Sequence, residues 1–184
     1  MTFFLKLKHW QLFGLLFCTF CAFQISGAST TVISLKDRTF TITEISPLVI
    51  LFISCVIGWY YSIGIILNKK IPASVKMQVT KFKWFLLLPV ISTIFYYSFL
   101  RFELFNSIYN GISSSLILVT ISILLLFFSI FCLFYCIYFN SKTIKTIELQ
   151  RYVNFSDFVN EFVLLFLFPI GIWIIQPRIN KMIK

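Results

Sequence analysis

The sequence predicts an all-α membrane protein with four transmembrane helices and a C-terminal amphipathic or re-entrant hydrophobic segment. Four mostly apolar runs support this prediction, since about 20 helical residues cross the ~30 Å hydrocarbon layer of a bilayer. Charged residues make up only 12% of the 184-residue chain, against about 25% in soluble domains. The expected spans are Trp10–Ala28, Pro47–Leu67, Phe82–Leu100 and Ser113–Phe139.

The first span has a signal peptide cleaved near Ala28 as its alternative interpretation. Its apolar run is long for a signal core, so we expect the segment to be retained as a helix. The connection that follows, Ser29–Ser46, alternates Thr and Ser with larger apolar residues around the tripeptide Lys36-Asp37-Arg38. This period-two pattern predicts a short β-hairpin with its turn at the charged residues.

The second span carries a stripe of small residues. Pro47 suits its first turn, because the missing N–H would be unpaired there anyway. Ser54, Gly58 and Ser62 follow at intervals of one helical turn, and such stripes let helices approach closely in lipid. We expect the stripe to pack within one chain, with packing between copies as the alternative.

The connection to the third span predicts a turn at Pro72. From Ser74 onward apolar residues recur at helical spacing, which predicts a short surface helix that leads into the span and turns its lysines toward lipid headgroups. Pro89 lies inside the third span and should kink it. Ser92 and Thr93 are close enough in sequence to hydrogen-bond the backbone of that region.

The fourth span is longer than a bilayer requires, so we expect it to tilt or to project into the cytoplasm. Its hydroxyl side chains have two interpretations. They line a narrow polar path in an oligomer, or they bond helix carbonyls and neighbouring helices, and we favour the second. These residues are Ser113, Ser114, Ser115, Thr120, Ser122 and Ser129.

The last part of the chain, residues 141–184, differs from the four-span domain of residues 1–140. Apolar residues at positions 144, 147, 152, 155, 158, 159 and 162 alternate with polar ones, a pattern typical of a helix lying at the membrane interface. Asn154 and Asp157 predict a capping box, with a new helix beginning near Phe155. The apolar run Phe162–Ile175, interrupted by Pro169 and Gly171, suits a re-entrant or interfacial segment better than a fifth span.

Three segments together resemble a group of small multi-pass bacterial membrane proteins. They are KHWQLF near the start, LNKKIPASVKMQVTKFK in the middle loop and FPIGIWIIQPRIN near the end. The resemblance covers the two ends and the middle loop. No activity is attached to the group, so the resemblance implies a bacterial membrane location and no chemistry.

The placement of charge predicts the orientation. Lysine and arginine in short loops favour the cytoplasmic side. The residues before the first span, the connection between the second and third spans and the tail of residues 141–184 are basic, whereas the other two connections are neutral. With both chain ends inside, 13 of the 16 Lys and Arg residues are cytoplasmic. We therefore expect a multi-pass protein of the bacterial cytoplasmic (inner) membrane with both termini in the cytoplasm.

The five cysteines all fall inside predicted spans, so we interpret them as buried thiols that pack as small hydrophobic groups. They are Cys18, Cys21, Cys55, Cys132 and Cys136. Cys18 and Cys21 form a CxxC pair, as in membrane enzymes that link disulfide formation to quinone reduction. That chemistry needs a second cysteine pair as a relay, which the outer connections lack, so a thiol–quinone oxidoreductase is a remote alternative.

The sequence contains little else with which to build a reactive centre. His9 is the single histidine and lies at a membrane edge, and no charged residue falls well inside a span, where proton and ion relays need one. A phosphate-binding loop, a serine elbow and paired catalytic carboxylates do not occur. We therefore assign no catalytic, cofactor-binding or metal-binding residue and expect no enzymatic activity.

We expect a non-enzymatic accessory, assembly or scaffold protein that acts through contacts at its cytoplasmic face. The alternative is an oligomeric channel, a pore-forming effector or a small transporter. The net charge of +10 lies between spans, where it meets anionic lipid headgroups rather than nucleic acid. The expected partners are these lipids, another membrane or cytoplasmic protein, or further copies of the chain. The candidate contact residues are Lys69, Lys70, Lys76, Lys81, Lys83, Trp84, Trp173 and Arg178.

Overall fold

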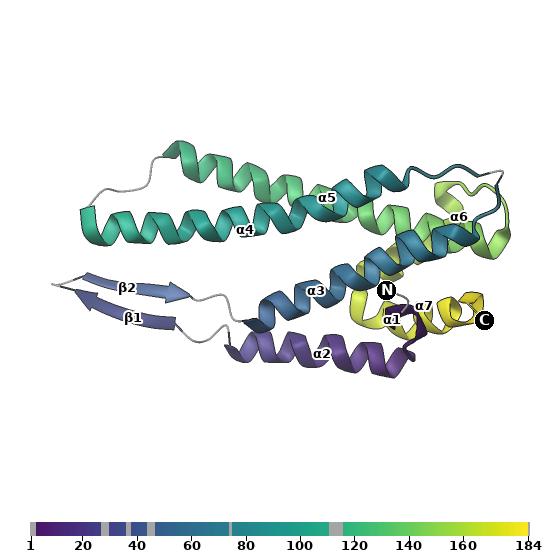
Figure 1. The fold of residues 1–184 in the computed structure, drawn as a ribbon, viewed down its shortest axis with the longest axis horizontal. Helices are drawn as coiled ribbons and strands as arrows, with labels where there is room; N and C mark the ends of the chain where they lie inside the picture. Colours follow the sequence, from purple (N-terminus) through teal and green to yellow (C-terminus); the bar gives the residue numbers. More distant parts are fainter. Residues whose placement is uncertain are drawn as a thin grey trace. The chain divides into compact units, whose positions relative to one another are not determined.

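The computed structural model describes residues 3–26, 30–35, 38–43, 47–73, 75–110 and 116–183, and this part of the chain is mainly helical (Figure 1). Each of the four expected spans is helical where it is described. The α-helices are α1 Phe3–Lys6, α2 His9–Ser26, α3 Pro47–Tyr61, α4 Val79–Asn110, α5 Leu116–Leu149, α6 Phe155–Phe166 and α7 Phe168–Ile183; a π-helical turn, η1 Ser62–Ile66, and a 3₁₀ turn, η2 Leu67–Lys70, continue α3.

Two helical segments within the described residues are long and apolar enough to cross a membrane. They are Leu51–Lys70, which joins α3 to its two continuing turns, and Thr120–Leu149 in α5. A shorter apolar stretch, His9–Cys21, lies in α2. A long apolar helix satisfies most of its backbone polar groups within the segment, which is the requirement for a segment within lipid.

The predicted hairpin is confirmed. Strand β1, Thr30–Leu35, pairs antiparallel with β2, Arg38–Thr43, so that Thr30 lies opposite Thr43 and Leu35 opposite Arg38. The alternation of Thr with apolar residues favours an extended backbone because β-branched side chains fit a pleated strand. The two remaining residues of the expected turn, Lys36 and Asp37, lie outside the described residues.

The contacts divide the chain into two compact units. Unit 1 contains Met1–Met77 and Phe139–Lys184, and unit 2 contains Gln78–Tyr138. This division differs from the expected boundary at residue 140, which lies inside α5. The helix continues to Leu149 because residues 140–149 contain no glycine or proline, and it ends where Gln150 adopts the left-handed conformation (φ 52°).

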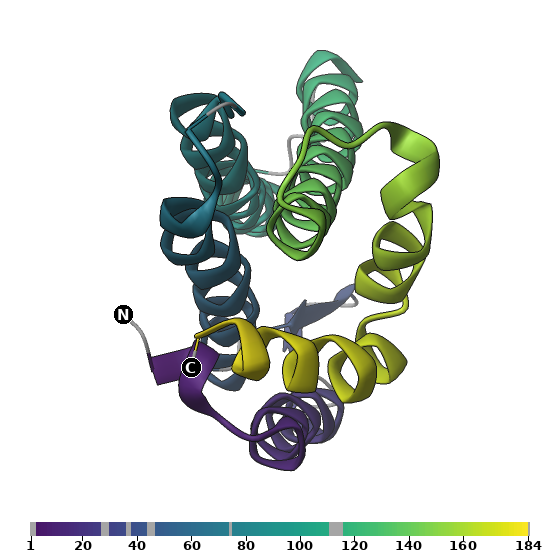
Figure 2. The same cartoon turned by 90° about the vertical axis from the view of Figure 1, so that its right-hand side faces the viewer.

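In unit 1 the two ends of the chain pack together. Helix α2 packs against α3, and α7 packs against α1, α2 and α6, as the view along the helices shows (Figure 2). The core contains large side chains that are almost completely buried, including Leu5, Leu12, Leu16, Trp59, Ile63, Phe158, Leu165, Ile172 and Ile175. Apolar burial of this kind is the main stabilising contribution to the core of unit 1.

The capping box at the start of α6 is confirmed. The Asn154 side chain accepts from the backbone of Asp157, and the Asp157 carboxylate accepts from the Asn154 backbone N–H at 3.0 Å. The α6 helix is amphipathic, as expected, with Phe158 and Leu165 buried and Phe166 exposed. Helix α6 ends at Phe166 and α7 begins at Phe168, so the interruption predicted around Pro169 is a sharp break between two helices.

The predicted surface helix from Ser74 is wrong. The turn at Pro72 is present, because the Val75 N–H donates to the Pro72 carbonyl at 3.0 Å. That bond ends the turn, residues 75–78 are not helical, and α4 begins at Val79.

In unit 2, α4 continues through Pro89. The hydroxyls of Ser92 and Thr93 donate to the Pro89 carbonyl at 3.0 and 2.7 Å, as their spacing suggested. The Ser92 and Ser129 hydroxyls also share a hydrogen bond, and Ser129 donates to the Leu125 carbonyl. Ser129 therefore joins α4 to α5, which is the helix-bonding role favoured from the sequence.

Candidate functional site at the lysine-rich end

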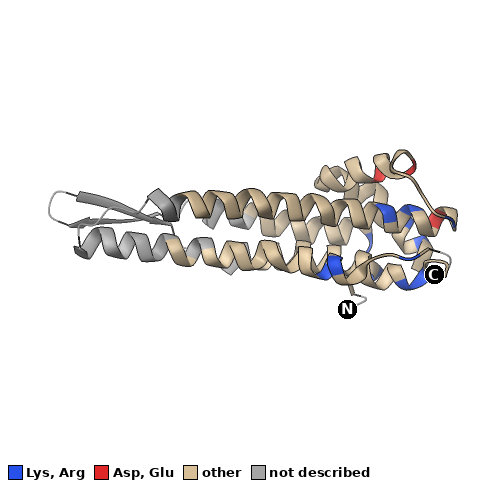
Figure 3. Ribbon diagram, turned by 90° about the horizontal axis from the view of Figure 1, so that it is seen from above, with Lys and Arg blue, Asp and Glu red and all other residues tan. Residues whose placement is uncertain are grey.

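The predicted contact residues divide between the two units. Within unit 1, Lys and Arg gather at the end that also holds both chain termini (Figure 3). Lys69 and Lys76 are exposed there, as is Trp173 on α7. Lys81, Lys83 and Trp84 are exposed at the start of α4, in unit 2. Exposed lysines beside a tryptophan are typical of a surface that meets headgroups.

Two of the predicted contact residues are used inside unit 1. The Lys70 ammonium donates to the Met182 carbonyl at 2.6 Å, so it holds the last turn of α7. A cation is favourable there, because the carbonyls of a helix C-terminus have no partners within the helix. Arg178 is bonded to two carboxylates, described below. Both residues therefore make contacts within unit 1, and Lys70 is itself exposed.

A buried amide, Gln176, connects three segments of unit 1. Its Oε1 accepts from the Trp59 indole N–H at 3.1 Å, and its Nε2 donates to the carbonyls of Phe4 and Leu7, each at 3.0 Å. Gln176 has no exposed surface. Since α1 is too short to satisfy its own carbonyls, the amide supplies the missing donor. Asn180, one turn further along α7, also donates to Leu7 at 3.1 Å.

A cluster of two acids and two bases joins α5, α6 and α7. The Arg178 guanidinium donates to both carboxylate oxygens of Glu148, at 2.7 and 2.6 Å, and to Glu161 at 2.6 Å. Lys145 completes the cluster, 3.1 Å from Glu161 and 3.5 Å from Glu148. Only 3% of the Glu161 side chain is exposed, so its charge requires this compensation. The cluster has no net charge.

The protonation of Glu161 depends on this cluster. Burial alone would raise the pKa of its carboxyl, but hydrogen bonds from Arg178, the helix backbone and Lys145 outweigh burial, and the pKa lies below its ordinary value. The hydrogen bonds from Arg178 to Glu148 raise the pKa of the Arg178 guanidinium despite its burial. Both groups are therefore held in their charged forms. The cluster is suited to holding three helices together rather than to transferring a proton.

Two glycines permit close approaches in unit 1. A Cβ on Gly171 would lie 1.8 Å from the Leu164 carbonyl oxygen, so only glycine fits where α7 turns against α6. A Cβ on Gly58 would lie 2.6 Å from the Phe4 ring. At Gly58 the small-residue stripe of the second span therefore packs within the chain, as expected. Its neighbour Ser62 donates to the Gly58 carbonyl at 2.7 Å, whereas Ser54 is exposed.

The π-helical turn of α3 meets α5 through a buried amide. Asn140 donates to the Tyr60 carbonyl at 3.2 Å and has no exposed surface. A π-turn changes the spacing of backbone hydrogen bonds, so a carbonyl beside it is available to a side-chain donor. Thr143, nearly one turn further along α5, donates to the Phe139 carbonyl at 2.9 Å and approaches the Met77 sulfur at 3.8 Å. The polar face of this part of α5 is therefore used in packing.

The cysteines are free and differ in burial. Cys55, Cys132 and Cys136 are buried, as expected, but the prediction was wrong for Cys18, which is exposed, and Cys21 is partly exposed. The even distribution of apolar residues around α2 gives no signal for which face packs, which explains this error. Across the described ranges, His, Cys, Asp and Glu side chains form no group of three that could hold a metal ion.

Comparison with protein-family models, with curated proteins and with solved structures found no match for this chain. The interpretation of the site therefore depends on its geometry.

Sequence reasoning missed the central residues of this end of unit 1, which are Gln176, Glu148 and Glu161. A signal was present for Glu148 and Glu161, because they are two of only six acidic residues in a strongly basic chain, and acids in apolar surroundings require partners. Gln176 has no such signal, since a single glutamine near an apolar run is also compatible with an exposed position.

Proposed function

We propose that this chain is a multi-pass membrane protein that crosses the bilayer with α2, with α3 and its continuing turns, with α4 and with α5. Both termini lie in the cytoplasm, and the protein acts by contact, as an accessory subunit, assembly factor or scaffold. The proposal is supported by two helices of spanning length, by two further helices in the other apolar runs, and by the distribution of basic residues.

The observation that carries the proposal is the use of polar groups at the lysine-rich end of unit 1. Gln176 and Arg178 each bind two or more other segments of the chain. These contacts make a structurally fixed end and direct its buried polar groups inward. The exposed lysines around it are available to headgroups or to a partner. A surface whose buried contacts are already formed suits recognition, because fewer side chains must be ordered on binding.

Site-specific photocrosslinking in cells tests this proposal. A photoreactive residue is placed at Lys69 or Lys76, which are exposed in unit 1, and at Phe127, an exposed position on α5, as the matched control. We expect a discrete protein adduct from positions 69 and 76 and only lipid adducts from position 127. Adducts at position 127 alone, or at none of the positions, contradict action through this surface.

The channel alternative is tested with the pure protein in liposomes. Contact function predicts no ion flux above that of empty vesicles at any oligomeric state. Reproducible flux that depends on protein concentration would replace the contact proposal with the channel.

A further inference from the structure

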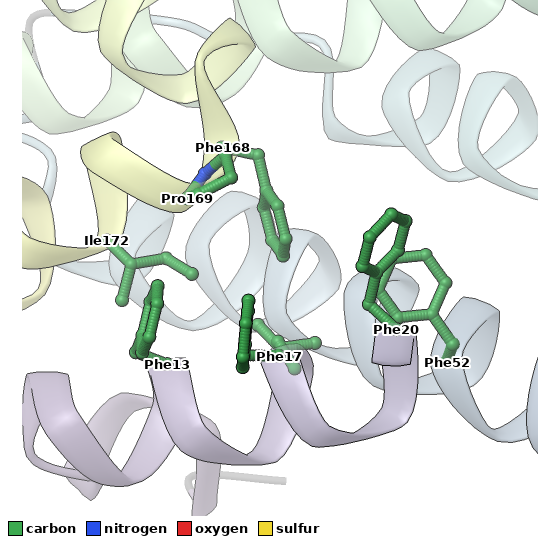
Figure 4. Close-up of a pocket in the computed structure, with 8 residues that line it drawn as sticks. Phe13, Phe17, Phe20, Phe52, Phe168, Pro169 and Ile172 are labelled. Atoms are coloured by element: carbon green, nitrogen blue, oxygen red, sulfur yellow. The ribbon is translucent and has the colours of Figure 1, made fainter. Parts of the chain in front are cut away.

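Unit 1 contains an apolar cavity of about 210 Å³ between α2, α3 and the first turn of α7 (Figure 4). Phe13, Phe17 and Phe20 of α2 form one wall, and Phe168 faces them from the start of α7. Phe52 of α3 closes the end near Phe20. The residues that line the cavity are all apolar. A cavity lined in this way has nothing to offer water and is filled by an apolar group or by none.

The size and shape of this cavity fit a hydrocarbon chain. It exceeds the engineered cavity of about 150 Å³ that accepts benzene. Its wall on α2 extends from Phe13 to Phe20, which is about 10 Å along the helix axis. A cavity of this volume with a wall of this length has room for part of one hydrocarbon chain, and we call it the slot.

The slot has a fixed floor and an open side. Leu16 and Ile172, which line it, are completely buried. Gly171 lets α7 approach the Leu164 carbonyl closely. This close contact at the break between α6 and α7 helps to place Phe168. Phe17 is 51% exposed and stands at the rim. A chain in the surrounding bilayer can therefore enter from the side without unfolding of the walls.

The segment that precedes the Phe13 end of the slot in the chain is basic. Phe13 lies one turn from His9, and Trp173 packs between them, with ring centroids 4.9 Å from His9 and 5.4 Å from Phe13. Lys6 and Lys8, just before α2, are exposed, and the sequence contains no acidic residue before Asp37. An anionic headgroup at this rim meets cations without a competing carboxylate from its own segment.

We propose that the slot binds one acyl chain of an anionic membrane phospholipid whose headgroup lies against Lys6 and Lys8. The inference rests on the membrane placement in the proposed function. The walls of the slot come from α2, α3 and the start of α7. A bound acyl chain contacts all three, so it also strengthens the contact between α2 and the start of α7. The charge complementarity of the rim selects an anionic phospholipid over a zwitterionic one.

Native mass spectrometry of the full chain in detergent micelles tests the proposal, with phosphatidylglycerol and phosphatidylethanolamine of identical chains as the probes. We expect the wild type to retain one phosphatidylglycerol. F17W places a larger ring in the slot, and retention should fall about tenfold, the effect of losing roughly two buried methylene groups. The matched control F127W makes the same change at an exposed position on α5 and should retain lipid as the wild type does.

The outcomes separate a site from the general lipid shell. Equal retention by F17W and F127W, or equal retention of the two lipids by the wild type, overturns the proposal. If F17W does not fold, F20W fills the other end of the slot and is compared with F127W in the same way. The double variant K6Q/K8Q should remove the preference for phosphatidylglycerol, whereas K69Q/K76Q should keep it.

Failure here is distinct from failure of the proposed function. The retention assay does not depend on which face of the membrane the termini occupy. A chain with the proposed topology and no lipid preference loses only the lipid site. A chain that retains phosphatidylglycerol but fails topology mapping keeps the site and loses the orientation.

Discussion

The interactions within unit 1 differ in kind from the interactions within unit 2. In unit 1, buried amides and an ion cluster join segments that are far apart in sequence, with Gln176 reaching Phe4 and Arg178 reaching Glu148. In unit 2, the contacts between α4 and α5 include aromatic ones, such as Phe85 with Tyr135, whose ring centroids are 4.4 Å apart, and the hydroxyl pair of Ser92 and Ser129.

This difference follows from the surroundings that the two units are proposed to have. Within hydrocarbon, a polar group without a partner is costly and a charge more so, so helices pair through packing and an occasional hydroxyl. Near the headgroups, water lowers the cost of bringing charges into the fold, and polar contacts can specify which segments meet. Unit 1 should therefore be sensitive to single polar substitutions, and unit 2 should tolerate them.

The largest effect should come from G171A, which tests whether the break between α6 and α7 is essential to unit 1. The new Cβ would lie 1.8 Å from a backbone oxygen, so the break must open, and we expect destabilisation of about 4 kcal/mol or more. The measurement is the free energy of unfolding by SDS titration in mixed micelles. G14A is the control, since a Cβ on Gly14 meets nothing within 4 Å, and it should be neutral or slightly stabilising. Similar losses in both variants would contradict the account.

Removal of the buried amide in Q176L should cost about 3 kcal/mol, because the Trp59 indole N–H and the Phe4 carbonyl lose their Gln176 partner and the Leu7 carbonyl keeps only Asn180. We also expect the N-terminal segment to become sensitive to protease, since Asn180 alone of the two amides then holds it. Limited proteolysis with mass analysis measures this change. Q78L, at an exposed glutamine, is the control. A protected N-terminus in Q176L would show that apolar contacts alone hold α1.

The ion cluster is tested by R178M, which leaves the buried Glu161 with Lys145 as its remaining cationic partner. We expect destabilisation of about 2–3 kcal/mol, somewhat below the full cost of breaking a buried pair, because Lys145 remains. R151M is the control, since Arg151 is exposed and its nitrogen lies 3.9 Å from Asp157, and its effect should be below about 1 kcal/mol. Equal effects on the unfolding free energy would mean that the cluster adds nothing beyond a surface pair.

The pH dependence of stability sharpens the same point. The pKa of Glu161 in the folded chain lies below its ordinary value of 4.5. Its contribution to stability is therefore present above pH 4.5 and is lost as the pH falls through the folded-state pKa. Compared with wild type, E161Q should show a shallower loss of unfolding free energy in this acidic range. Parallel curves for the two proteins would contradict a stabilising role for the ionised carboxylate.

The smallest effect should come from unit 2. S129A removes the hydroxyl shared with Ser92, which keeps its bond to the Pro89 carbonyl, so the loss should be about 0.6 kcal/mol. S98A is the control, because Ser98 is exposed and bonds only its own helix at Ile94 in the contacts described. An S129A effect as large as that of R178M would remove the distinction between the two units.

The sequence was sufficient for features that depend on local pattern. The length of the apolar runs predicted the helices, the alternation around Lys36-Asp37-Arg38 predicted the hairpin, and the pair Asn154 and Asp157 predicted the start of α6. Each depends on residues that are neighbours in the chain, so periodicity or spacing is enough.

The features that were missed depend on residues far apart in the chain. The contact of Gln176 with Phe4 joins residues 172 positions apart, and the part of α5 beyond residue 140 lies outside the apolar run from which the helix was predicted. The even apolar distribution around α2 also hid the exposure of Cys18. The apolar slot was equally invisible, because its phenylalanines resemble the others of an apolar run until α7 is placed beside them.

The central claim is that the chain crosses the membrane an even number of times, with its lysine-rich end in the cytoplasm. Cysteine labelling in intact cells tests it, after replacement of the five native cysteines and introduction of K8C, K181C or D37C. A membrane-impermeant maleimide should label D37C in intact cells, and should label K8C and K181C only after permeabilisation. Labelling of K8C and K181C from opposite faces would contradict the account.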